Sequence, residues 1–194
     1  MGQRLVITIH AFDEDIAKIY YHWCAYTTSA LQEAKDIIDN VDWFNSTSKD
    51  ELVLRITRQL EKCGGGVSIR DREAFKKKYP NETFKDNIDR NYGLIAITDD
   101  GMEELEHWAQ GDLTIDFDTE KVYNDVMFTY ESDEEFKQDR LDAGFEDDDI
   151  GVKNIKQLLL DPTEVHFFAL DSAIETLDGL QFCRYFDRIY ELII

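Results

Sequence analysis

Acidic charge is concentrated in one stretch of this chain, and the same stretch carries a regular apolar pattern. Residues 99–149 hold 20 acidic and 3 basic residues, a net charge of −17 out of −21 for all 194 residues, whereas residues 1–98 are nearly neutral. Because 43% of the chain is hydrophobic and 12% is aromatic, it is too apolar for a disordered acidic protein. The chain must therefore fold while displaying many carboxylates close together, at a cost in self-repulsion.

Local patterns predict two β-hairpins. Residues 4–10 and 16–23 are rich in β-branched and aromatic residues and flank an acidic turn at residues 13–15. Leu113, Ile115 and Phe117 alternate with acidic residues, and residues 122–130 return across a second turn, which predicts one buried and one acidic face. We expect an α+β fold, with an antiparallel sheet built from two hairpins and helices packed on one side.

Capping signals locate two helices. Ser29 with Gln32, and Ser48 with Glu51, have the capping-box spacing before amphipathic patterns. The three glycines at 64–66 end the second pattern. They follow a helix and lack the Lys-Ser/Thr ending of a phosphate loop, so we interpret them as a helix stop. Residues 1–150 are predicted to form an α+β domain that contains the acidic region 99–149, and residues 151–194 a mainly helical C-terminal appendage.

Composition also limits compartment and partners. The acidic surface repels phosphate backbones and anionic membranes, so we expect no direct nucleic-acid binding and no membrane association. No apolar run is long enough for a signal peptide or a membrane span. The three cysteines are odd in number and far apart, which is typical of free thiols in a reducing cytoplasm.

An aromatic run at residues 20–23 is the least ordinary local feature. Tyr21, His22, Trp23, Tyr26 and Thr28 could line a pocket that binds or hydrolyses a nucleotide-like ligand, with His22 transferring protons and the hydroxyls at a helix start holding an anion. The alternative is ordinary packing of aromatic side chains on the two faces of a strand.

The first 30 residues resemble a family of uncharacterised phage and bacterial proteins. The resemblance rests on Met1-Gly2-Gln3-Arg4, matching a Met-Gly-x-Arg start, and on Tyr21-His22-Trp23 with Tyr26, matching an aromatic-x-His-Trp-x-x-Tyr stretch. The chain departs from the usual Asp-Gly-Tyr-Pro continuation by having Cys24-Ala25-Tyr26-Thr27. The resemblance implies a phage or prophage origin and no particular activity.

Charge and origin together favour an inhibitor without catalysis. A folded array of carboxylates can imitate duplex phosphates and occupy the basic channel of a host defence nuclease, either RNA-guided or of the restriction class, in the host cytoplasm. An acidic surface without such a partner is the alternative. The predicted anchors are Glu103, Glu104, Glu106, Asp112, Asp116, Asp118, Asp133, Glu134 and Glu135.

Signals for metals, cofactors and enzyme chemistry are weak. The four histidines (His10, His22, His107 and His166) lack zinc-site spacing, so no metal site, no cofactor and no catalytic residue is predicted. Carboxylates at 142–149 could hold Ca²⁺ or Mg²⁺, but a solvated acidic loop is favoured. A dimer seam formed by Phe182, Tyr185, Phe186 and Ile189 is a third possibility, from an assembly class of function.

Overall fold

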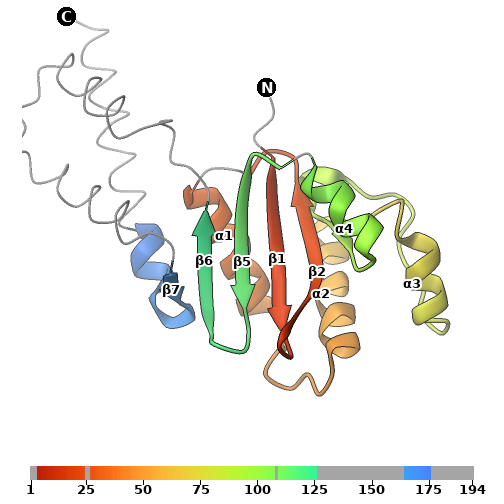
Figure 1. Cartoon of the computed structure of the whole chain (residues 1–194), viewed down its shortest axis with the longest axis horizontal. Helices are drawn as coiled ribbons and strands as arrows, with labels where there is room; N and C mark the ends of the chain where they lie inside the picture. Colours follow the sequence, from red (N-terminus) through yellow and green to blue (C-terminus); the bar gives the residue numbers. More distant parts are fainter. Residues whose placement is uncertain (1–3, 25–26, 108, 126–163, 176–194) are drawn as a thin grey trace, which may run out of the picture.

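A mixed seven-stranded sheet forms the centre of the protein (Figure 1). The computed structural model describes residues 4–24, 27–107, 109–125 and 164–175. The strand order is β3-β4-β2-β1-β5-β6-β7. The strands are β1 (Leu5–Ala11), β2 (Glu14–Tyr21), β3 (Gly66–Val67), β4 (Leu94–Ala96), β5 (Gly111–Asp116), β6 (Lys121–Asp125) and β7 (Glu164–His166).

Strand β1 lies in the middle of the sheet and has one antiparallel and one parallel neighbour. It pairs antiparallel with β2 and parallel with β5, and β3 and β4 form a second parallel pair. The α+β class is therefore confirmed, but the sheet is mixed and not antiparallel as predicted. Local patterns indicate which strands are consecutive, whereas the β1–β5 pairing joins segments about a hundred residues apart.

Helices cover both faces of the sheet, so the expectation of helices on one side is wrong. α1 and α2 pack against the main core, where Leu5, Ile7 and Ile9 of β1 are fully buried. α4 covers the opposite face through Leu105, which packs with Val6 and other residues in a smaller cluster. The helices are α1 (Thr27–Asn40), α2 (Lys49–Cys63), α3 (Arg72–Lys78) and α4 (Asp99–Glu106), with a short 3-10 turn η1 (Arg90–Tyr92) and another, η2 (Phe167–Ala169).

The predicted ends of α2 are confirmed, whereas the predicted start of α1 is wrong. The hydroxyl oxygen of Ser48 accepts a hydrogen bond from the backbone N–H of Glu51, and Gly64 ends the helix with φ +112° and a hydrogen bond from its N–H to the carbonyl of Leu60. Helix α1 begins at Thr27, so Ser29 lies inside it and is not its cap. Thr27 and Thr28 extend this helix by about half a turn before Ser29.

Glu51 gives the stability of the protein a pH dependence. The backbone N–H and hydroxyl of Thr47, together with Arg55, stabilise the Glu51 carboxylate and lower its pKa to about 2. Because the pKa is depressed, this contribution to stability is fully present above the ordinary value of 4.5 and is lost as pH falls toward 2. Glu51→Gln should therefore lower the urea midpoint at neutral pH, and its difference from the wild type should shrink on acidification. Glu73→Gln, on the exposed side of α3, is the control, and a pH-independent difference for Glu51→Gln would contradict the prediction.

The sheet extends past the predicted domain boundary at residue 150. Strand β7 pairs antiparallel with β6, with Val165 opposite Val122. Residues 126–163 and 176–194 are outside the described residues, so the division into a domain and a helical appendage stays a prediction. Within the described part of the chain, no helix has the length and apolar character needed to cross a membrane.

Candidate functional site

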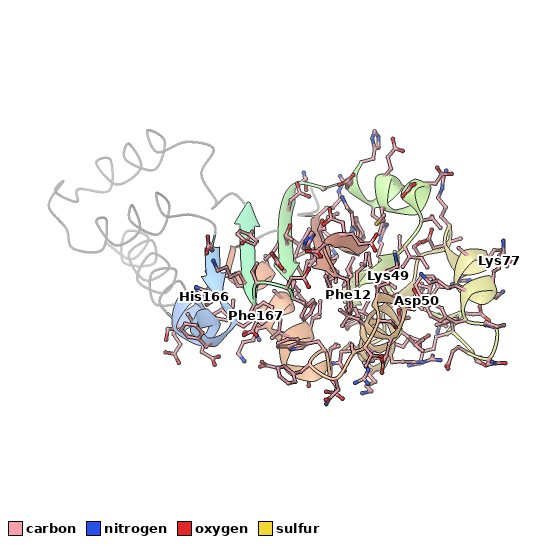
Figure 2. The ribbon with its side chains drawn as sticks, turned by 60° about the horizontal axis from the view of Figure 1, so that its bottom comes forward. Phe12, Lys49, Asp50, Lys77, His166 and Phe167 are labelled. Carbon is pink, nitrogen blue, oxygen red and sulfur yellow. The ribbon has the colours of Figure 1, made fainter. Side chains whose placement is uncertain are left out.

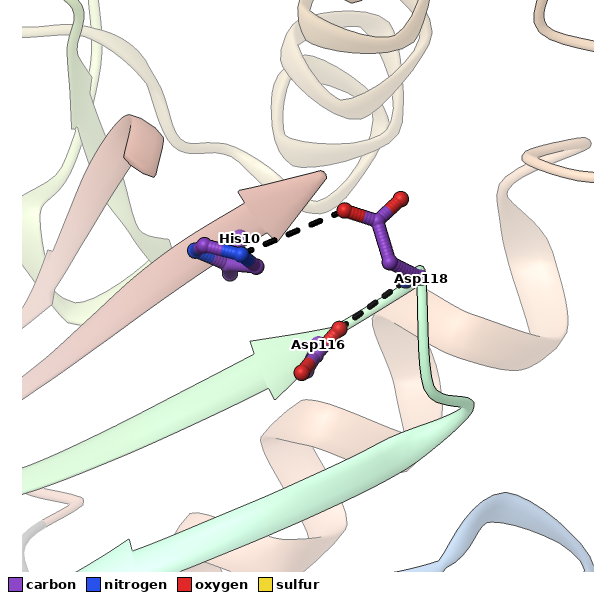
Figure 3. Close-up of side chains that lie close together, drawn as sticks. All are labelled: His10, Asp116 and Asp118. Carbon is purple, nitrogen blue, oxygen red and sulfur yellow. Dashed lines mark hydrogen bonds and ion pairs between the residues drawn. The ribbon is translucent and has the colours of Figure 1, made fainter. Parts of the chain in front are cut away.

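The carboxyl ends of the two central parallel strands bring a histidine next to two aspartates (Figure 3). His10 and Asp116 are directly opposite each other in the β1–β5 ladder, and Asp118 follows in the turn to β6. One ligand atom from each of the three side chains lies within 4.8 Å of the other two. In open sheets, the carboxyl ends of parallel strands are a common place for ligand binding. These three residues, with Asp15, are called the His–Asp cluster below.

An irregularity in β2 adds Asp15 to the His–Asp cluster. The pairing of β1 with β2 shifts between Ile9 and His10, so that Ile9 faces Ala17 while His10 faces Asp15. The extra residue, Ile16, is buried in the core, and the shift leaves Asp15 beside the imidazole. Nδ1 of His10 is 2.7 Å from Oδ1 of Asp15.

Asp118 holds two neighbouring turns together. Its carboxylate accepts hydrogen bonds from the backbone N–H groups of Phe12 and Asp13, at 2.9 and 2.8 Å. Phe12 and Asp13 both have positive φ, which suits a tight turn between two antiparallel strands. Figure 2 brings this end of the sheet forward and shows Phe12 between Phe167 on one side and Lys49, at the start of α2, on the other. Lys49 pairs with Glu14 of β2 at 2.6 Å.

The electrostatics of the cluster are dominated by three carboxylates around one imidazole. The hydrogen bond with Asp15 raises the pKa of His10, burial partly opposes this, and the negative charges of Asp116, Asp15 and Asp118 add to it. Nε2 of His10 is 3.9 Å from Oδ2 of Asp118, which is an ion-pair distance but too long for a hydrogen bond. The arrangement can hold a proton on His10, or a cation between Nε2 and the two aspartates.

Asp116 and Asp118 are two of the anchors predicted for a partner, and the expectation is wrong for Asp116, which is buried. Asp116 is only 8% exposed, and its Oδ1 accepts hydrogen bonds from the backbone N–H groups of Asp118 and Thr119. Asp118 is more exposed, but its carboxylate is engaged by the neighbouring turn. The alternation of apolar and acidic residues in β5 predicts the direction of these side chains, but not the turn that they stabilise.

The remaining described anchors lie at the surface. Glu103, Glu104 and Glu106 are exposed on α4, and Asp112 is exposed on β5. Arg70 reaches α4 from the segment before α3 and pairs with Glu104 at 3.1 Å and Asp100 at 3.7 Å, while Glu106 pairs with Lys18. A shallow groove of about 460 Å³ runs along this helix, lined by Arg70, Asp100, Glu103, Glu104 and His107.

The predicted aromatic pocket is not assembled as expected. Tyr21 is buried in the main core, whereas Tyr20 packs in the cluster on the opposite face of the sheet and places its hydroxyl 2.9 Å from Nδ1 of His22. Trp23 is 54% exposed and meets the His22 ring edge-on. Loss of hydration and the nearby charges of Arg90 and Arg4 lower the pKa of His22, which favours the neutral imidazole.

Several predicted site residues lie outside the described residues. Tyr26 and the side chain of Thr28 belong to this group, and Thr28 is placed only as the second residue of α1. The other members are the anchors Asp133, Glu134 and Glu135, the candidate cation loop at 142–149, and the dimer seam with Phe182, Tyr185, Phe186 and Ile189.

Cys24 and Cys63 should differ strongly in reactivity. Burial and the negative charge of Glu33 raise the pKa of Cys24 to about 12, whereas Cys63 is exposed at the end of α2. Because the thiolate is the nucleophile, we expect iodoacetamide to alkylate Cys24 at least about 100-fold more slowly than Cys63 in the folded protein. Peptide mass spectrometry over time measures both rates. Equal rates in the native protein would contradict the prediction, and equal rates in denaturant are the control.

Comparisons with known proteins give no relative from which a function could be inferred, so the proposals below rest on the sequence and the geometry. No protein-family model, no curated protein and no solved structure matches the chain.

Proposed function

We propose that this protein is an inhibitor without catalytic activity, which binds the basic surface of a host nucleic-acid-binding defence protein in the host cytoplasm. The target class is an RNA-guided or restriction nuclease, whose DNA channel must be positively charged to hold duplex phosphates. The inhibitor would act by imitating DNA or by blocking the channel as a protein. A phage or prophage origin, which the N-terminal resemblance implies, fits this role.

The observation that supports the proposal is the outer face of α4. Asp100, Glu103 and Glu104 have the three- and four-residue spacing that places side chains on one side of a helix, and the side chain of Asp100 is 81% exposed. Arg70 neutralises part of this face through Asp100 and Glu104. Glu103 is therefore the best-placed anchor on this helix, and Asp112 on β5 adds a further exposed carboxylate.

Electrostatic attraction of this kind has a specific signature. Exposed charges steer a partner over the Debye length, which falls from about 30 Å at 0.01 M salt to about 8 Å at 0.15 M. Association should therefore be fast and should weaken steeply as salt is added. Inhibition through apolar contacts or through a small-molecule pocket would change little with salt.

The test measures DNA binding by a panel of purified RNA-guided and restriction nucleases, using fluorescence anisotropy of a labelled duplex at several salt concentrations. We expect the wild-type protein to displace the duplex from at least one nuclease, less effectively at high salt. The variant Glu103→Lys with Glu104→Lys should lose most of the inhibition. Lysines in the second half of a helix are compatible with its dipole, so this variant should fold.

A matched control reverses the same number of charges elsewhere. Glu73 on α3 and Asp86 after it have side chains 90% and 89% exposed, so Glu73→Lys with Asp86→Lys changes the net charge equally away from α4. This control should retain inhibition. The proposal fails if no nuclease in the panel is inhibited, if inhibition is insensitive to salt, or if the α4 variant and the control inhibit equally.

A further inference from the structure

We propose that the His–Asp cluster is a binding site for a divalent transition-metal ion of the zinc type, held by Nε2 of His10 and by carboxylate oxygens of Asp116 and Asp118. The three ligand atoms come from β1, from β5 and from the turn that follows β5 (Figure 3). This site is separate from the acidic face of α4 and does not depend on the proposed inhibitory function.

The orientation of the His10 ring is the first argument for a metal. Its Nδ1 lies 2.7 Å from Asp15, which favours the tautomer with the proton on Nδ1 and the lone pair on Nε2. Nε2 then faces Asp118 at 3.9 Å without a hydrogen bond. Histidines that bind metals almost always donate their other ring N–H to a carboxylate, a backbone carbonyl or a water, and Asp15 would be that acceptor here, a positioning residue.

The spacing of the ligand atoms is the second argument. Zinc bonds to nitrogen and oxygen are about 2.0–2.2 Å long, so ligand atoms around one ion lie roughly 3–4 Å apart. The separation of 3.9 Å between Nε2 and Oδ2 of Asp118 falls in this range, and all three ligand atoms lie within 4.8 Å of one another.

Charge and access also suit a cation. His10, Asp15 and Asp118 have side chains 31%, 54% and 36% exposed, so an ion can enter from solvent. The Asp116 carboxylate accepts hydrogen bonds from backbone N–H groups. Lys121 lies opposite Asp116 in the ladder, but its ammonium group pairs with Glu164. The cluster therefore keeps the negative charge of its three carboxylates next to one imidazole, which favours a cation.

The donor set selects the class of ion. Ca²⁺ and Mg²⁺ prefer shells of oxygen ligands, whereas an imidazole with two carboxylates suits zinc and its neighbours in the first transition row. Three protein ligands leave one position for water. A bound ion would also join the β1–β2 turn to the β5–β6 turn, so binding should raise the thermal unfolding temperature.

The experiment uses the full-length protein without an affinity tag, treated with a chelator and dialysed, and titrated with Zn²⁺ by calorimetry and thermal unfolding. We expect binding of one Zn²⁺ at this site and a rise in Tm, and no competition from Mg²⁺ or Ca²⁺. Two-dimensional NMR of the imidazole nitrogens should show a shift of Nε2 of His10 on addition of Zn²⁺, with Nδ1 still protonated.

Variants locate the binding. His10→Gln and Asp116→Asn should each weaken Zn²⁺ binding by more than about tenfold, and Asp15→Asn should weaken it by about 10- to 100-fold through the imidazole. Asn at 116 can still accept the two turn hydrogen bonds, so this variant should keep the fold if His10→Gln does not. His107→Gln, at the C-terminus of α4 and outside the His–Asp cluster, is the control and should bind like the wild type. The proposal would be overturned if folded wild-type protein bound no Zn²⁺, if the two ligand variants bound Zn²⁺ as tightly as the wild type, or if Nε2 of His10 did not shift.

Discussion

Replacing Asp71 by alanine is expected to destabilise the protein by about 3–5 kcal/mol, because it removes a buried carboxylate that satisfies three donors. Asp71 is fully buried directly before α3, and it accepts hydrogen bonds from the backbone N–H groups of Ile97 and Thr98 and from the hydroxyl of Thr98. In the alanine variant these donors remain buried without an acceptor. The result would be visible as a lower urea midpoint at neutral pH.

Two variants test whether the hydrogen bonds of Asp71 cause this loss. Asp71→Asn keeps one acceptor oxygen but turns an amide group toward the remaining donors, so it should be intermediate in stability. Asp86→Ala removes an exposed carboxylate from the segment after α3 and should change stability by no more than about 0.5 kcal/mol. A loss below about 1 kcal/mol for Asp71→Ala would mean that these donors find water or another partner.

Elements that depend on local sequence were predictable. The cap and stop of α2 use residues within a few positions of the helix ends, namely Ser48, Glu51 and Gly64, and the structure has them in these roles. The strands flanking residues 118–120 also follow local patterns. In each case the relevant physical interaction joins residues that are close in sequence.

The pairing of strands that are far apart in the sequence could not be predicted from local patterns. The parallel ladder of β1 and β5 places His10 opposite Asp116, and a shift in the β1–β2 pairing adds Asp15. None of these residues has metal-site spacing along the chain, so the His–Asp cluster carries no motif. The acidic cluster at 13–15 and the alternation in β5 indicated the two turns, but not that they meet.

The net charge of residues 99–149 also does not describe the charge of the folded surface around α4. Arg70 lies outside that stretch, yet it pairs with Asp100 and Glu104, and Lys18 from β2 pairs with Glu106. The segmental charge thus overstates the field at α4. Exposed pairs of this kind contribute only about 0–1 kcal/mol each to stability, so their main effect is to reduce the charge that a partner meets.

The three glycines at 64–66 are predicted to be unequal, and Gly65→Ala should be the most damaging substitution among them. A Cβ on Gly65 would lie 2.2 Å from the carbonyl oxygens of both Tyr92 and Gly93. The clash is with backbone, so η1 and the start of β4 would have to move away from the end of α2. We expect a loss of about 4 kcal/mol, at the upper end of single-substitution effects.

Gly64→Ala is the matched comparison for this prediction. Gly64 has φ +112°, where a side chain costs about 1–2 kcal/mol, but its Cβ would meet only the ring of Tyr92, at 3.1 Å, and this ring is half exposed and can turn. In the Gly65→Ala variant, by contrast, displacement of the backbone would also break the hydrogen bond from the Gly66 N–H to the Gly93 carbonyl, which begins the β3–β4 pair. Urea unfolding of both variants separates the two effects. If Gly65→Ala were no more destabilising than Gly64→Ala, the close approach of η1 to the end of α2 would not be the reason that glycine occupies position 65.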